Sequence, residues 1–141
     1  MQTFAFTGPR KLTPKQEAEA RHVLWSLSSP AVWLFGDAEG LDALARDLAP
    51  IGVLFEAKSK RVWELQARSK RMVEAIAYAG GTLHAFPNKP CPTGLTLQSW
   101  QGSGTWGTIV YAHSKGVPVE LHWLCFPEQV PWLEQKQLAL F

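Results

Sequence analysis

The chain has 141 residues, of which 46% are hydrophobic and 18% charged; this composition predicts one folded domain and excludes an intrinsically disordered chain. A formal net charge of +2 is too small to indicate nucleic-acid binding by itself. Cys91 and Cys125 form no CxxC pair, which argues against a disulfide framework and fits a reducing compartment. With neither a signal-peptide pattern nor a membrane-spanning apolar run, we expect a cytoplasmic protein without a membrane partner.

Short apolar segments alternate along the chain with segments whose apolar residues recur at helical spacing. The apolar segments predict strands at residues 3–7, 31–35, 51–55, 82–86 and 117–121. The periodic segments predict helices at residues 14–27, 41–48, 58–79 and 105–115. Strands that alternate with helices favour right-handed crossovers, so we expect an α/β fold: a mostly parallel five-stranded sheet with helices on both faces.

Two helices carry further local signals. Thr13 is a good N-cap, Pro14 suits the first helical position, and Gln16 completes a capping box. The predicted helix over residues 58–79 begins with a basic stretch that only Glu64 offsets, and we expect a break near Ser69. The basic residues are Lys58, Lys60, Arg61, Arg68, Lys70 and Arg71.

A ligand site is expected where the strands end, because parallel sheets bind ligands at their carboxyl edge. Segments 7–10, 36–42, 86–88 and 102–108 all fall at this edge. The last is a small-residue loop that leads into a helix, and exposed amides at a helix N-terminus attract phosphate. The alternative is a plain strand-to-helix turn with glycines for tight packing. The candidate ligand-binding residues are Gly8, Arg10, Gly36, Asp37, Gly40, Asp42, Arg68, Arg71, Gly102, Ser103, Gly104 and Thr105.

The charged candidates have distinct expected roles. Arg10 is suited to pair with a phosphate in a bidentate manner. Asp37 and Asp42 are expected either to accept from ribose hydroxyls or hold a metal, or to balance the positive end of a helix. Arg68 and Arg71 either reach the same crevice or belong to a solvated helix face.

Neither a metal centre nor a catalytic residue can be assigned from the pattern. The four histidines are scattered, and His122 with Cys125 is only a weak ligand pair, so we expect no metal site. The chain lacks GxSxG and P-loop lysine motifs, and no serine or cysteine has an evident base partner.

Five segments in order resemble the SLOG superfamily, which includes DNA-processing protein A, the Lonely Guy phosphoribohydrolases and small stand-alone proteins. The segments are TGPR at 7–10, GDAEGLDALARDLA at 36–49, RSKRMV at 68–73, LHAFP at 83–87 and GSGTWGTIVYAHSKGVPV at 102–119. The resemblance covers residues 1–122 and leaves residues 123–141 as a C-terminal extension. It implies a Rossmann-like fold that binds nucleotides or nucleotide-derived ligands, and the small stand-alone branch fits best.

Departures from the family pattern bear on catalysis. Lonely Guy enzymes have a PGGxGTxxE motif, whereas this chain has Ser103 at the second glycine and Thr108 at the glutamate. We therefore expect a protein that binds a nucleotide or another phosphate-bearing ligand without strong catalysis. One alternative is a nucleic-acid binding module that uses the basic stretch and Trp63. A second alternative is a nucleotide phosphoribohydrolase, which would break an N-glycosidic bond.

The last five residues, QLALF, resemble the pentapeptide by which bacterial replication and repair proteins dock to the polymerase III sliding clamp. In that resemblance Gln137 fixes the register, while Leu138, Leu140 and Phe141 fill an apolar cleft. The alternative is that these apolar residues fold back on the domain. Clamp docking would favour the nucleic-acid hypothesis, and a homo-oligomer stays open.

Overall fold

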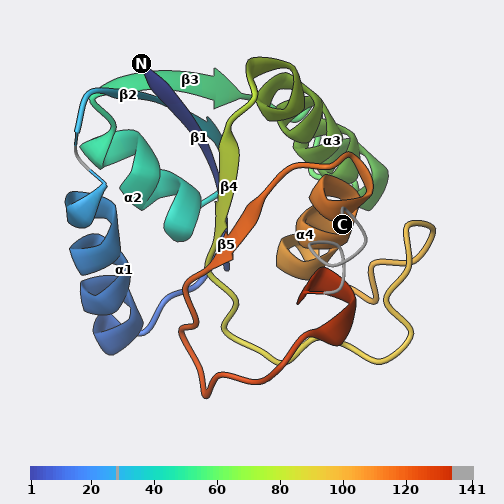
Figure 1. Ribbon diagram of the computed structural model, residues 1–141. Helices are drawn as coiled ribbons and strands as arrows, with labels where there is room; N and C mark the ends of the chain where they lie inside the picture. Colours follow the sequence, from blue (N-terminus) through green and yellow to red (C-terminus); the bar gives the residue numbers. More distant parts are fainter. Residues whose placement is uncertain (28, 135–141) are drawn as a thin grey trace.

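The computed structural model describes residues 1–27 and 29–134, in which strands and helices alternate (Figure 1). The strands are β1 (Gln2–Thr7), β2 (Ala31–Gly36), β3 (Ile51–Phe55), β4 (Thr82–Ala85) and β5 (Val119–Leu121). The helices are α1 (Pro14–Ser26), α2 (Leu41–Leu48), α3 (Val62–Ala79) and α4 (Gly104–Ser114). None of the helices in these two ranges is long and apolar enough to cross a membrane.

The strands form one sheet in the order β3-β2-β1-β4-β5, and every neighbouring pair is parallel. The central strand is β1, whose Ala5 lies opposite Leu34 of β2 and Leu83 of β4. The predicted five-stranded α/β fold is therefore confirmed, with a sheet that is parallel throughout.

Helices cover both faces of the sheet, as the sequence predicts (Figure 1). On one face, α1 and α2 bury Leu24 and Leu41 against Phe6 and Trp33. On the other face, α3 and α4 contribute a second core. Its fully or nearly buried residues are Ala5, Leu34, Met72, Val73, Ile76, Leu83, Ala112 and Val117. Each large apolar side chain buried in this way contributes roughly 1.5–3 kcal/mol.

The helix ends follow the local signals, with one exception. The Thr13 hydroxyl accepts from the Gln16 amide at 3.1 Å, and the Gln16 side chain accepts from the Thr13 amide at 3.1 Å, so the capping box forms. The expected break near Ser69 is wrong, because α3 runs unbroken from Val62 to Ala79. Ser69 is buried and continues the stripe that leads to Met72.

The final strand, β5, begins at Val119 and not at the predicted Val117, because Val117 is hydrogen-bonded to the end of α4. The Val117 amide donates to the Ala112 carbonyl at 3.0 Å and so closes the end of the helix. Pro118 has no amide hydrogen, and its carbonyl accepts from Leu83 at 2.9 Å before regular pairing begins at Val119. The chain then returns over the sheet, where Val130 packs on Ala85, Trp106 and Ile109. The boundary predicted at residue 122 stays a prediction.

Candidate phosphate-binding cleft

A cleft of about 650 Å³ opens at the carboxyl edge of the sheet. All four segments that the sequence places at this edge contribute to it. Its wall is made by residues 7–11, Ala38, Asp42, Lys60, Val62, Leu65, Gln66, Arg68, Ser69, residues 88–90, Pro92 and residues 100–106. Of the predicted ligand-binding residues, Gly36, Asp37, Gly40 and Arg71 are not among those that line it.

The N-terminus of α4 forms one wall of the cleft. The Ser103 hydroxyl accepts from the Trp106 amide at 3.1 Å, and the Ser103 carbonyl accepts from Gly107 at 2.9 Å. Helix geometry gives the amides of Gly104 and Thr105 no intrahelical acceptor. A Cβ atom added at Gly102 or Gly104 would meet nothing within 4 Å, so the backbone here faces open space. This is the arrangement that binds phosphate at a helix N-terminus.

The long loop before α4 is held in place by two tryptophans. Trp106 is buried, and its indole Nε1 donates to the Lys89 carbonyl at 2.9 Å. Trp100 packs directly on Gly107, where any Cβ would overlap the indole ring. These contacts hold the Lys89 backbone beside the first turn of α4, in the lining of the cleft. The sequence pattern does not predict this placement, because the loop lacks periodicity.

The charged side chains that line the cleft are predominantly basic. Four basic side chains form no ion pair within residues 1–27 and 29–134: Arg10, Lys11, Lys60 and Lys89. The acidic lining residue is Asp42, which is buried. The cleft therefore combines a helix N-terminus with uncompensated positive charge, and both features attract anions.

Arg68 forms an ion pair within the protein. Its guanidinium donates to the Asp37 carboxylate at 2.6 Å. The same carboxylate accepts from the Ala57 amide at 3.1 Å, so the pair ties the loop after β2 to the loop after β3. Burial alone would raise the pKa of Asp37, but the hydrogen bonds from Arg68 and Ala57 hold it below its usual value. The pair therefore shapes the rim of the cleft.

Asp42 has an internal partner as well. It is 7% exposed, and its carboxylate accepts from the Ala38 amide at 3.3 Å, which closes the turn into α2. Burial raises the pKa of this carboxyl, and the nearby Arg68 opposes that rise. A Cβ atom at Gly36 would lie 2.6 Å from the Asp42 carboxylate and 3.0 Å from the Arg68 guanidinium carbon. Gly36 thus provides the space in which both side chains fit.

The other predicted glycines and Arg71 also have contacts within the protein. A Cβ atom at Gly8 would lie 2.5 Å from the Leu41 side chain. Gly40 has φ +68° and lies against the Pro9 carbonyl, so it is required by the turn. Arg71 donates to the Glu56 carbonyl at 2.6 Å. The packing alternative thus accounts for the glycines near β1 and β2, whereas Gly102 and Gly104 face open space.

Thr108, which the sequence resemblance aligns with the glutamate of Lonely Guy enzymes, is a buried residue. Thr108 is 1% exposed, and its hydroxyl donates to the Gly104 carbonyl at 2.7 Å. This hydrogen bond stays inside the first turn of α4, so the hydroxyl is directed to the helix backbone. The predicted docking residues Gln137, Leu138, Leu140 and Phe141 lie outside the described residues, so clamp docking stays a prediction.

The fold of this chain is shared with proteins of known structure. No family model and no curated protein matches the chain. DNA processing protein A from Helicobacter pylori, which binds single-stranded DNA, superposes with a TM-score of 0.64 at 12% identity, over 98% of this chain and 73% of that one. DNA processing protein A from Streptococcus pneumoniae gives a TM-score of 0.62 at 12% identity, over 99% of this chain and 56% of that one. The chain thus has the Rossmann-like α/β fold found in DNA processing protein A.

Proposed function

We propose that the chain binds single-stranded nucleic acid, with a backbone phosphate at the N-terminus of α4. The observation that carries the proposal is the cleft itself, in which unpaired basic side chains surround the helix N-terminus. The fold shared with a protein that binds single-stranded DNA supports it. Membership of the SLOG superfamily and its small stand-alone branch is part of the same proposal.

Base stacking supplies the second component of such binding. Trp63 is 61% exposed in the first turn of α3, and it directly follows Val62, which lines the cleft. Exposed aromatic rings beside basic side chains bind single strands with little sequence preference, because every base has a stacking face. We therefore expect Trp63 to stack on a base whose phosphate lies in the cleft.

Salt dependence tests this proposal. Fluorescence anisotropy with a labelled oligothymidine should give an affinity that falls steeply as salt rises. Lys89→Ala should weaken binding and reduce the slope of log affinity against log salt by about one. Lys115→Ala is the matched control, since Lys115 follows the opposite end of α4. Absence of binding at low salt, or equal slopes for the two variants, would contradict the proposal.

A nucleotide or nucleotide-derived small molecule is the second candidate ligand. A cleft of about 650 Å³ is of the size that holds such molecules, for which about 300–1,000 Å³ is typical. Thermal-shift screening with nucleoside monophosphates would reveal it, and Arg10→Ala should abolish the shift. A monophosphate that displaces the oligonucleotide would assign both ligands to one site. We do not extend the proposal to ribosyl hydrolysis, because Thr108 supplies no carboxylate.

Docking to a bacterial sliding clamp would link this binding to replication or repair. The motif Gln137–Phe141 carries this part of the proposal on sequence alone. Clamp affinity of the full chain should exceed that of a chain ending at Lys136. Equal affinity of the two chains would remove the docking hypothesis and leave the cleft unaffected.

A further inference from the structure

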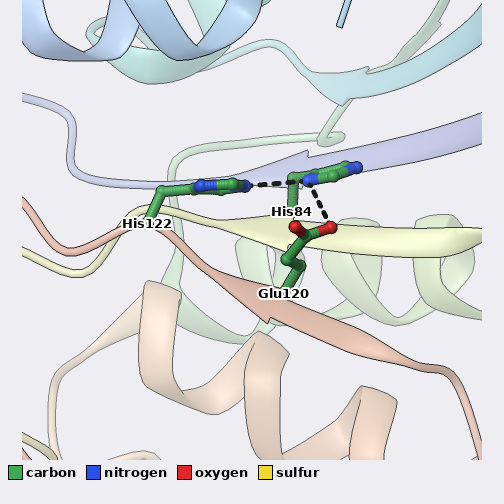
Figure 2. A group of neighbouring side chains, drawn as sticks. All are labelled: His84, Glu120 and His122. Atoms are coloured by element: carbon green, nitrogen blue, oxygen red, sulfur yellow. Dashed lines mark hydrogen bonds and ion pairs between the residues drawn. The ribbon is translucent and has the colours of Figure 1, made fainter. Parts of the chain in front are cut away.

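Three potential metal ligands meet on neighbouring strands, away from the residues that line the cleft (Figure 2). His84 lies in β4 and is paired in register with Glu120 of β5. Paired residues of a sheet project from the same face, and so does the residue two positions further on. His122 follows Glu120 at that spacing, which explains why all three side chains converge.

The cluster lies on the α1–α2 face of the sheet. His84 is 1% exposed, and its ring packs edge-on against Phe4 and is stacked against Phe6. Glu120, in contrast, has a side chain that is 63% exposed. The site is therefore anchored in the core by one histidine and open to solvent on its carboxylate side.

The three ligand atoms are close enough to share one ion. His84 Nδ1 lies 2.9 Å from His122 Nε2 and 3.6 Å from the Glu120 carboxylate, and the three atoms all lie within 4.8 Å of one another. An ion about 2.0–2.2 Å from each ligand would hold tetrahedral ligand atoms roughly 3.3 Å apart. We propose that His84, Glu120 and His122 bind a divalent transition-metal ion of the Zn²⁺ class.

The chemistry of the donor set favours this class of ion. Two imidazoles with one carboxylate suit Zn²⁺ and its neighbours, whereas Mg²⁺ and Ca²⁺ prefer oxygen ligands alone. The two imidazoles present ring nitrogens to one another, His84 Nδ1 and His122 Nε2, and such ring nitrogens are the commonest metal ligands in proteins. Three protein ligands and an exposed side leave the fourth position for water or an exogenous ligand.

The sequence pattern predicts no metal site here, because the ligands are separated along the chain. His84 and His122 are 38 positions apart, and only the parallel register of β4 and β5 places them together. The one local signal is Glu120-x-His122, two ligands at the spacing of one strand face. This spacing is common, and it does not indicate a metal site until the partner strand that supplies His84 is known.

Zinc titration of the untagged, chelator-treated chain tests the inference. With a competing chromophoric indicator, the wild type should bind one Zn²⁺ per chain. Glu120→Gln and His122→Gln should each weaken binding by at least about tenfold. These two positions are chosen because His84 is a core residue whose replacement endangers folding. His22→Gln, on the exposed side of α1, is the matched control and should bind as the wild type does.

The cysteines require a separate control, since thiolates also bind zinc. Cys91→Ser and Cys125→Ser should leave the affinity unchanged. The melting temperature should rise with zinc in the wild type and in His22→Gln, and rise less at the same zinc concentration in Glu120→Gln and His122→Gln. Equal zinc affinity of the wild type and both cluster variants, or loss of binding only in a cysteine variant, would overturn the inference. Circular dichroism of each variant verifies that a loss of zinc binding is not caused by unfolding.

Discussion

Two aspartates near the turn into α2 have pKa values that are shifted in opposite directions. Asp37 is held ionised by Arg68, whereas burial raises the pKa of Asp42. A carboxyl with a raised pKa contributes its full stability below its unfolded pKa and loses it as the pH rises through the folded pKa. Ionised Asp42 therefore destabilises the fold at neutral pH relative to its protonated form.

Replacing Asp42 with asparagine should remove this pH dependence. The amide oxygen keeps the hydrogen bond from Ala38, and the variant has no proton to lose at this site. We expect Asp42→Asn to be more stable than the wild type at neutral pH, with a difference that shrinks in acid. Urea unfolding over a pH series measures this. A difference that stays constant with pH would show that Asp42 is not the titrating group.

The glycines offer a second test at the scale of single residues. Gly36→Ala forces a methyl group against Asp42 and Arg68, so it should cost about 1–3 kcal/mol. Gly104→Ala adds its methyl group to open space in the first turn of α4, so it should leave the fold intact or stabilise it by about 0.4–1 kcal/mol. The free energy of unfolding from urea titration separates the two. Similar losses at both positions would contradict the assignment of Gly36 to packing and Gly104 to the open cleft.

At the scale of elements, α4 and the loop before it act as one unit. The indole of Trp106 is the link, since it donates to the Lys89 carbonyl. Trp106→Phe removes this hydrogen bond and keeps most of the packing, which should cost about 1 kcal/mol. Because Lys89 then loses its fixed position, oligonucleotide affinity should fall severalfold in anisotropy titrations. Trp25→Phe, at an exposed position on α1, should change neither quantity, and a parallel loss there would refute a specific role for Trp106.

The sequence predicts elements well where the signal is local. The stripe from Leu41 to Leu48 and the apolar run from Ile51 to Phe55 match α2 and β3 residue for residue. The reason is that each pattern is local and that Pro50 separates the two segments. Contacts between segments, in contrast, are not predicted by local patterns. The Trp106–Lys89 hydrogen bond joins residues 17 positions apart. The opposite pKa shifts of the two aspartates depend on the hydrogen bonds from Arg68 and Ala57 to Asp37 and on the burial of Asp42.

The same distinction applies to the site. Parallel strands alone predict that segments 7–10 and 102–108 meet at one edge, and they do. They do not predict which side chains remain free. Arg68 forms an ion pair with Asp37, and Arg71 donates to the Glu56 carbonyl. Lys89, in contrast, lines the cleft from a loop that has no periodicity. Which basic residues face a ligand is decided by such tertiary contacts.

At the scale of the whole molecule, β3 is an edge strand with an exposed apolar surface. Ile51, Val53 and Leu54 are each more than two-fifths exposed, at 47%, 41% and 43%. Such an edge is a template for pairing with another chain. Val53→Lys should slow aggregation in concentrated solution, measured by light scattering, with a stability change within about 0.5 kcal/mol. An unchanged aggregation rate would show that another surface is responsible.

The central position of β1 has a consequence for how the chain folds as it is made. Each neighbour of β1 comes later in the chain, β2 at Ala31 and β4 at Thr82. A parallel partner strand cannot be reached through a hairpin and needs a crossover connection. The strand that carries Phe4 and Phe6 therefore stays unpaired on each side until the crossover to β2 or to β4 has been made. During synthesis at about 5–20 residues per second, that interval lasts several seconds. The strand that ends at the centre of the sheet thus lacks its partner on one side until β4 at residues 82–85 has been made.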